Sequence, residues 1–217
     1  MTTTAPKTNG RRSLSPVEAA RETVGIFPIT VQQYHRMIEQ GIVPEDSTVE
    51  LIRGMLVRKD RGIAGEHSMG HSPLHRAIVT LLTQLAARTQ ADSHYVQIQL
   101  PISCPPDTEP EPDAAIIRGQ PRDYLERFPG PGDVSCVIEA AHSSLDRDRE
   151  DKLPVYAAAG IPQYVIVNLQ NVTLEVHTEP DPSAEAYGSK VTVDRNGQVA
   201  IRLPGGEITI EAREILP

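Results

Sequence analysis

Hydrophobic and polar positions along the chain follow two periods, about 3.6 residues and two residues, which distinguish the predicted helices from the predicted strands. The first helical segment begins with a T-x-x-Q capping box, Thr30-Val-Gln-Gln33. Ile29 and Tyr34 are placed for a hydrophobic staple, and Gly41 is placed to end the helix. This pattern predicts a short helix over residues 31–40.

A longer helix is predicted over residues 73–88, because Ser72 can cap it and Pro73 suits its first position. Its apolar residues recur at helical spacing and form one stripe: Leu74, Ile78, Leu81, Leu82 and Leu85. A third helical stretch covers residues 148–159, and glycine and proline residues follow it as stop signals.

The strand pattern occurs in short apolar runs that are bounded by turn residues. Residues 48–57 alternate in polarity around Gly54, which predicts a hairpin or a bulged turn. Core strands are predicted at residues 95–100, 114–117, 134–138 and 164–168. Shorter strands, which would extend the sheet or flank it, are predicted at residues 172–178, 190–193, 199–203 and 207–210.

The order helix, three strands, helix, strand predicts an α/β protein with a mixed, twisted sheet, flanking helices and extra C-terminal strands. The chain has 217 residues, 39% of them hydrophobic, which favours one domain with one sizeable core. We place that domain at residues 26–217. Residues 1–25 are rich in Thr, Ser, Pro and basic residues, so we predict a disordered tail there.

Composition also bears on the compartment. There is no run of about 18 apolar residues and no secretory-signal layout, so we expect a cytoplasmic protein that is not associated with a membrane. Cys104 and Cys136 have no metal-ligand spacing and are predicted to be unpaired thiols, with Cys136 buried.

The net charge of −8 argues against broad electrostatic adhesion to nucleic acid, which requires basic surface. The net charge does not exclude a nucleic-acid substrate, because a metal-binding catalytic site must itself carry carboxylates. Two local basic clusters remain as candidate contacts: Arg58-Lys59 with Arg61, and Arg147 with Arg149. The alternative interpretation of each cluster is a solvated run of surface charge.

The most informative chemistry is a trio of charged residues at the edges of apolar runs. Asp113 opens one predicted strand, Glu139 lies near the end of the next, and Lys152 follows on a helix. Two carboxylates can hold Mg²⁺ or Mn²⁺, which would polarise a phosphoryl oxygen and activate a water. A lysine near the scissile phosphate can stabilise developing charge or position the attacking water. Glu50 is a candidate third acidic member of this site.

Further candidates for substrate or phosphate contacts are His75, Gln97 and Arg147. His67, His71 and His75 recur every four residues, but Gly and Pro interrupt the segment and disfavour a zinc site. Tyr156 and Tyr164 are interpreted as packing residues.

Each member of the trio also has a structural interpretation. Asp113 follows a proline and can cap a turn. Glu139 follows a buried run and can form a salt bridge with Lys152 or an arginine. Lys152 can be an exposed charge on an amphipathic helix. These alternatives stay open at the level of sequence.

In combination and order, several segments between about Phe27 and Pro217 resemble the Uma-type putative restriction endonuclease family, within the PD-(D/E)xK nuclease superfamily. The matching segments are Val49-Glu-Leu-Ile-Arg-Gly54, Ser72-Pro-Leu-His75, Glu109-Pro-Glu-Pro-Asp113, Val137-Ile-Glu139, Asp148-Arg-Glu-Asp-Lys152 and Tyr156-Ala-Ala-Ala-Gly-Ile-Pro-Gln-Tyr164. The resemblance implies a restriction-endonuclease-like fold and a metal-dependent site.

The chain departs from the parent superfamily at one position. The usual lysine stands two residues after the acidic residue, and here that position is Ala141. The resemblance implies that the lysine has moved onto the following helix, where Lys152 takes its place.

The function expected from these residues is metal-dependent endonuclease activity on DNA. The alternatives are a catalytically inactive interaction module with a nuclease fold and a nuclease that acts on RNA or structured nucleic acid. A homodimer is expected, because cleavage of a duplex requires two scissions and a two-fold axis places two sites symmetrically. A partner protein is a further candidate, since the acidic charge predicts weak non-specific binding.

Overall fold

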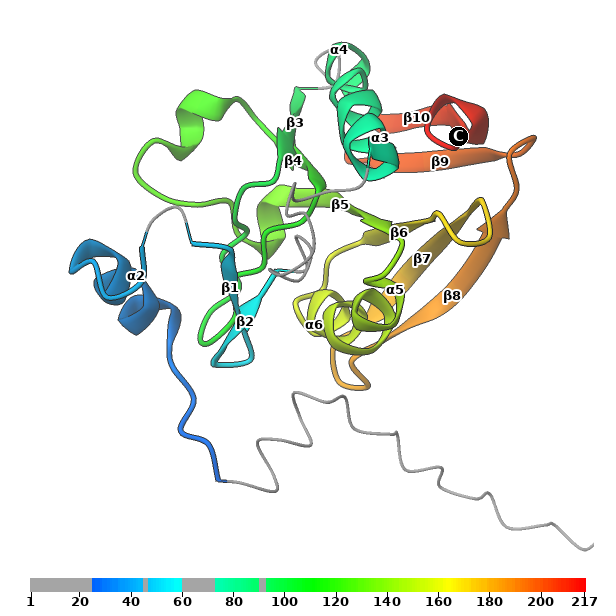
Figure 1. Ribbon diagram of the computed structural model, residues 1–217. Coiled ribbons are helices and arrows are strands. Elements are labelled where there is room, and N and C mark those ends of the chain that lie inside the picture. The colour runs from blue at the N-terminus through cyan, green and yellow to red at the C-terminus, as the bar shows by residue number, and fades with distance from the viewer. Residues whose placement is uncertain (1–24, 45–46, 60–72, 90–92) are drawn as a thin grey trace, which may run out of the picture.

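The computed structural model describes residues 25–44, 47–59, 73–89 and 93–217. At its centre is a six-stranded sheet in the order β3-β4-β5-β6-β7-β8 (Figure 1). The strands are β3 (His94–Ile98), β4 (Ala114–Arg118), β5 (Val134–Ala141), β6 (Gln163–Asn168), β7 (Thr173–Asp181) and β8 (Ala186–Val193). Only β5 and β6 run parallel among these pairs, so the predicted mixed sheet is confirmed.

The connection between the two parallel strands is helical. It consists of α5 (Leu145–Arg147), the π-helical turn η4 (Asp148–Lys152) and α6 (Leu153–Ala158). Parallel neighbours require such a crossover, because a tight turn cannot return the chain to the same end of the sheet. The prediction of one helical stretch over residues 148–159 missed the π turn.

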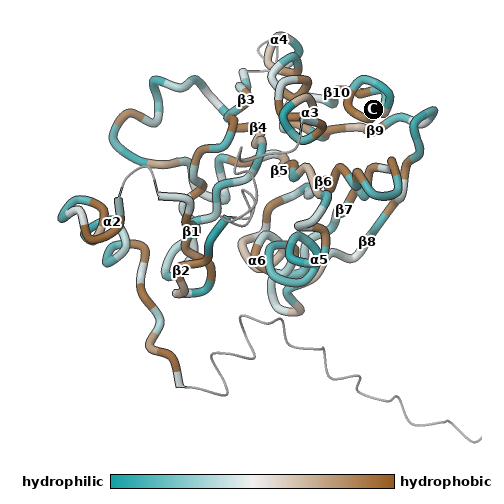
Figure 2. Tube along the Cα trace, in the orientation of Figure 1, coloured by the Kyte–Doolittle hydropathy of each residue, from teal (hydrophilic) through white to brown (hydrophobic). Residues whose placement is uncertain are grey.

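Both faces of the sheet are covered, and alternate residues of β4 show this directly. Ala114 and Ile116 pack with α3 (Pro73–Thr83) and with the hairpin of β9 (Gln198–Leu203) and β10 (Gly206–Glu211). Ala115 and Ile117 pack on the opposite face with residues of the α5–α6 segment. Figure 2 accordingly shows hydrophobic residues concentrated in the central strands.

A smaller unit lies beside the sheet. It contains α2 (Val31–Glu39) and the hairpin of β1 (Val49–Ile52) and β2 (Met55–Arg58). Leu51 bridges to Glu109, which ties the hairpin to the segment that leads into β4. This attachment brings the first strand of the hairpin close to the start of β4.

The first predicted helix forms as expected, whereas the second is divided in two. The capping box at α2 is present, with the Gln33 amide N–H donating to Thr30 Oγ1 at 3.2 Å. The helix predicted over residues 73–88 is divided into α3 and α4 (Ala86–Thr89), because the amides of Gln84 and Leu85 bond to carbonyls three residues back. Both cysteines are free and buried, as expected.

Of the four C-terminal strands, two extend the central sheet and two flank it, and both arrangements were among those predicted. β7 and β8 extend the sheet, whereas β9 and β10 form the separate hairpin that flanks it. β8 begins at Ala186, four residues before the predicted start, because it pairs along most of β7. Short 3-10 segments complete the chain at η2 (Pro121–Tyr124), η3 (Pro131–Asp133) and η5 (Ala212–Glu214).

Some predictions fall on residues outside the described ranges. The predicted tail over residues 1–25 does so except at Gly25, and Arg61, His67 and His71 also lie outside. Across the described part of the chain, no helix is long and apolar enough to cross a membrane.

The turn of the β1–β2 hairpin gives a test of the fold. Arg53 and Gly54 both have positive φ, 50° and 77°, as a type I′ turn requires. A Cβ at Gly54 would also lie 2.4 Å from Pro28 Cβ. We expect Gly54→Ala to lower the free energy of unfolding by about 2 kcal/mol in urea denaturation. Gly132→Ala, where a Cβ meets open space, should change it by less than about 0.5 kcal/mol. Equal effects would contradict this account.

Candidate active site

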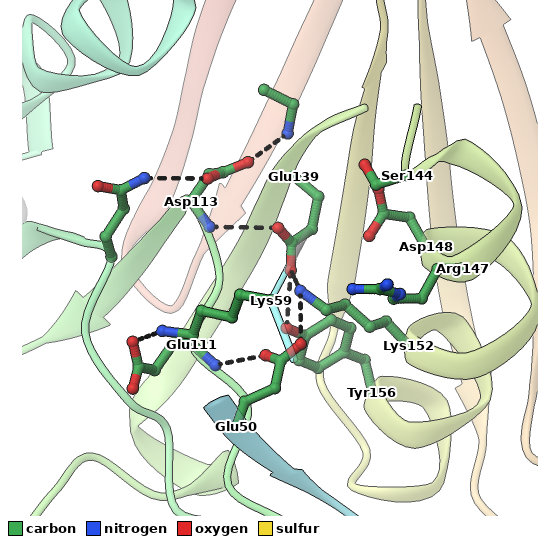
Figure 3. A network of polar contacts seen from close by, with 12 residues as sticks. Glu50, Lys59, Glu111, Asp113, Glu139, Ser144, Arg147, Asp148, Lys152 and Tyr156 are labelled. Carbon is green, nitrogen blue, oxygen red and sulfur yellow. Dashed lines mark hydrogen bonds and ion pairs between the residues drawn. The ribbon is translucent and has the colours of Figure 1, made fainter. Parts of the chain in front are cut away.

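Asp113, Glu139 and Lys152 lie together in the structure (Figure 3). Ala114 pairs with Ile138 across β4 and β5, which makes Asp113 and Glu139 neighbours at the same end of these strands. The Asp113 amide donates to Glu139 Oε2 at 3.3 Å, and Lys152 Nζ donates to Glu139 Oε1 at 2.8 Å. Three separate elements therefore supply one site.

The π turn explains how Lys152 reaches the sheet. The Leu153 amide bonds to the Asp148 carbonyl five residues back, in place of an α-helical bond. Pro154 follows directly, and a proline ring inside a helix disrupts the regular bonding of the preceding turn. The extra residue in this turn changes the angular position of Lys152, and such turns are frequent at functional sites. Ala141, two residues after Glu139, is buried in β5.

Glu50 approaches the same group from β1. Its side chain is buried, and its Oε1 lies 3.6 Å from Lys152 Nζ. Its other oxygen, Oε2, accepts a hydrogen bond from the Glu111 amide at 3.1 Å. The ammonium of Lys152 thus lies between two buried carboxylates, Glu50 and Glu139 (Figure 3).

His75 of α3 contacts the carboxylate of Asp113. His75 Nε2 lies 3.2 Å from Asp113 Oδ1, and its Nδ1 lies 3.0 Å from the Ala140 carbonyl, to which it can only donate. Asp113 Oδ2 accepts the Ala140 amide at 2.8 Å. Burial opposes charge on both groups, but their mutual attraction outweighs it: the pKa of His75 is raised and that of Asp113 is lowered.

The structure adds residues that the sequence did not single out for this site. Tyr156 donates from its hydroxyl to Glu139 Oε1 at 3.1 Å. The Gln99 amide lies 3.4 Å from Asp113 Oδ1. Tyr156 is fully buried, as expected of a packing residue, but its hydroxyl also binds Glu139, so that interpretation was incomplete. Its spacing of four residues from Lys152 was a sequence signal that the two side chains lie on the same helix face.

Asp148 and Glu111 also belong to this neighbourhood. Asp148 is buried on the π turn and accepts a hydrogen bond from Ser144 Oγ at 2.8 Å. Glu111 forms an ion pair with Lys59 at the end of β2. Lys59, considered from sequence only as part of a surface cluster, has a side chain that is 10% exposed.

Two candidates have other contacts in the structure. The Gln97 side-chain amide donates to the carbonyls of Leu100 and Pro101, at 3.1 and 3.0 Å, and so holds the loop after β3. Arg147 donates to the carbonyl of Arg58 at 2.8 Å, linking α5 to the end of β2. Their predicted roles as substrate contacts stay predictions.

The site carries more negative than positive charge. The carboxylates of Glu50, Glu139 and Asp148 surround Lys152, and the lysine also acts on Asp113, whose pKa it lowers. Burial raises the pKa of Glu139, the Lys152 ammonium lowers it, and the neighbouring carboxylates of Asp148, Asp113 and Glu50 raise it further. Burial likewise raises the pKa of Asp148 to about 6. For Lys152, burial lowers the pKa, but the surrounding carboxylates more than offset this effect and raise it, so the lysine stays charged.

The donor set fits a hard divalent cation. Carboxylate oxygens are the ligands that Mg²⁺ and Mn²⁺ prefer, and a second positive charge would offset the remaining repulsion in the cluster. Among the described residues, no three His, Cys, Asp or Glu side chains form a ready coordination group. The predicted salt bridge of Glu139 to Lys152 is present, so Glu139 has a structural partner as well as a position suited to a ligand.

Comparisons with known proteins show the family and the fold of the chain. The family model Uma2, described as "Putative restriction endonuclease", matches residues 31–211. The chain therefore belongs to this family, as the resemblance of its motifs predicted. A search of curated proteins finds no match.

A solved structure shares the fold. It is the crystal structure of a putative nuclease belonging to DUF820 from Anabaena variabilis, with 13% sequence identity and a TM-score of 0.61. The match covers 87% of this chain and 97% of that chain. The predicted restriction-endonuclease-like α/β fold is thereby confirmed.

Asp148 gives a test of the electrostatics. Its folded-state pKa of about 6 lies above the usual 3.8, so the folded protein binds this proton more tightly than the unfolded chain. Its stabilising contribution is therefore present below about pH 4 and is lost as the pH rises through 6, by at most about 3 kcal/mol. We expect Asp148→Asn to reduce this loss in urea denaturation at a series of pH values. The exposed Asp146→Asn is the matched control, and identical profiles for the two variants would refute the assignment.

Proposed function

We propose that the protein is a divalent-metal-dependent endonuclease that hydrolyses phosphodiester bonds of DNA. The observation that supports this best is the 2.8 Å contact of Lys152 Nζ with Glu139 Oε1, immediately beside Asp113. The family to which the chain belongs and the fold it shares with another putative nuclease support the same reaction class.

Asp113 and Glu139 would hold Mg²⁺ or Mn²⁺. When bound, such an ion polarises a phosphoryl oxygen and lowers the pKa of a coordinated water. Glu50 adds negative charge from a third element and lies 3.6 Å from the lysine that these carboxylates share. Its proposed role is to keep that lysine charged and in place.

The protein's own residues would orient the reacting groups. The Lys152 ammonium can position the attacking water or stabilise charge that develops on the phosphate. Tyr156 fixes one oxygen of Glu139 through its hydroxyl, and His75 fixes one oxygen of Asp113. Because each oriented carboxylate keeps a defined position, little reorganisation is needed when substrate binds.

The first test is cleavage of supercoiled plasmid in Mg²⁺ or Mn²⁺. Asp113→Asn and Glu139→Gln should each reduce nicking at least about 100-fold, and a chelator should abolish it. Lys152→Met should have a similar effect, since losing one group that stabilises transition-state charge typically reduces rates 10²- to 10³-fold.

The matched control is Glu207→Gln, which removes an exposed carboxylate from the separate β9–β10 hairpin and should leave cleavage unchanged. Thermal denaturation establishes that each variant is folded, and calorimetry with Mn²⁺ separates loss of metal binding from loss of chemistry. If the wild type neither binds Mn²⁺ nor cleaves DNA, the interaction-module alternative is favoured. Cleavage confined to RNA would favour the other alternative.

We also propose that the active species is a homodimer, which would place two sites on the two strands of a duplex. Light scattering after size-exclusion chromatography should give twice the 23.7 kDa of the chain. A mass of one chain at the concentrations used for cleavage would contradict this proposal. Recruitment by a partner protein would then be the remaining way to strengthen binding to DNA.

A further inference from the structure

The sheet face that carries Glu139 also carries a second polar cluster, on β7. Glu139 pairs with Ile166 of β6, and Ile166 pairs with Glu175 of β7, so the three residues form one row across adjacent strands. Side chains in such a row lie on the same face of a sheet. Two strand spacings separate the two glutamates, which is about 10 Å.

Glu175 is surrounded by donors. Arg149 bonds to both carboxylate oxygens, one of them through Nε at 3.2 Å. Lys190 Nζ lies 2.7 Å from Oε2, and the Asn168 amide donates to Oε1 at 2.9 Å. We call Arg149, Asn168, Glu175 and Lys190 the β7 cluster.

The exposure of these side chains differs strongly. Glu175 is 3% exposed, whereas Arg149 is 37% exposed and Lys190 is 46% exposed. The single negative charge therefore lies beneath two positive charges that reach the surface. The four residues of the β7 cluster carry a net charge of +1, and the exposed carboxylate of Asp146 also acts on Arg149 from outside the cluster.

The protonation states support this charge count. Burial raises the pKa of Glu175, but hydrogen bonds from Arg149, Lys190 and Asn168 outweigh it and hold the pKa at about 2. His177 lies beside the β7 cluster, with its Nε2 3.9 Å from Glu175 Oε2. Burial and the nearby cations Lys190 and Arg149 lower the pKa of His177 to about 4. At neutral pH, Glu175 is ionised and His177 is uncharged.

The location matters because the chain is acidic. With a net charge of −8 and four carboxylates at the candidate active site, long-range electrostatics oppose the approach of a polyanion. Arg149 follows Asp148 directly in the π turn, so the cations of the β7 cluster lie next to the acidic site. A distance of about 10 Å is similar to that between phosphates one or two nucleotides apart on one strand, because the strand winds around the axis while it rises about 3.4 Å per base.

We propose that Arg149 and Lys190 bind a backbone phosphate of the nucleic acid, one or two nucleotides from the bond that is cleaved. This inference rests on the proposed nuclease function and deepens it by assigning a substrate-binding position. Arg149 keeps its fork geometry on Glu175, which orients it, and Lys190 adds a partly exposed ammonium on the edge strand β8. The competing interpretation is an ion network that only stabilises β7.

The test measures binding of a fluorescein-labelled DNA duplex by anisotropy, in EDTA to prevent cleavage, across a series of NaCl concentrations. Lys190→Ala should weaken binding and reduce the slope of log Kd against log salt by about 0.9, the value for one phosphate contact. Lys190→Arg restores the charge and should restore the slope. Glu175 retains Arg149 and Asn168 as partners in both variants, which favours normal folding.

Arg202→Ala is the matched control, because it removes one exposed cation from β9 on the opposite face of the sheet. It should leave the slope at the wild-type value. Equal slopes for Lys190→Ala and the wild type, or no binding of the duplex by the wild type, would overturn the inference. Metal-dependent plasmid cleavage by the wild type is a separate readout, so the nuclease proposal can survive that outcome.

Discussion

The candidate site depends on one buried ion pair, Lys152 with Glu139. Four carboxylates converge in a region where each would be costly to bury alone, and Lys152 is the ammonium they share. Removing a single partner from such a group leaves an uncompensated buried charge, which is far less favourable than the intact pair. Three features of the fold bring charged groups to that contact. The register of β4 on β5 positions Asp113 beside Glu139, the π turn positions Lys152, and the β1–β2 hairpin positions Glu50. The geometry of the site therefore depends on how the whole domain packs.

The same sheet face separates charge by strand. Carboxylates gather around β5, while two surface cations gather over β7. Both groups are anchored on regular elements, and positions on strands and helices are held more tightly than positions on loops. The α5–α6 segment links them, because Asp148 and Lys152 point to the first cluster and Arg149 to the second. A π turn between two α-helical segments lets three residues within one turn serve two sites.

Local signals predicted the local features well. The capping box at Thr30 and the hairpin turn at Gly54 depend on nearby residues alone, and both are present. Gln97 illustrates where periodicity failed. The predicted strand over residues 95–100 ends at Ile98, and Gln99 adopts a positive φ of 49°. The two-residue alternation therefore stops, so that Gln99 lies near Asp113 while Gln97 bonds to the loop. A backbone reversal of this kind depends on contacts that a strand pattern does not contain.

The sequence by itself determined the class of fold, because apolar periodicity encodes the elements, and the order of its short motifs predicted Asp113, Glu139 and Lys152 as candidate site residues. It also marked Ala141 as a position where the expected lysine is missing. Only the tertiary structure decided that Lys152 reaches Glu139, because that contact requires a helical crossover with one extra residue in its turn. It likewise decided that Tyr156, Asp148 and the β7 cluster face the same side of the sheet. Such convergence depends on strand register and helix rotation, which are properties of the whole packed domain.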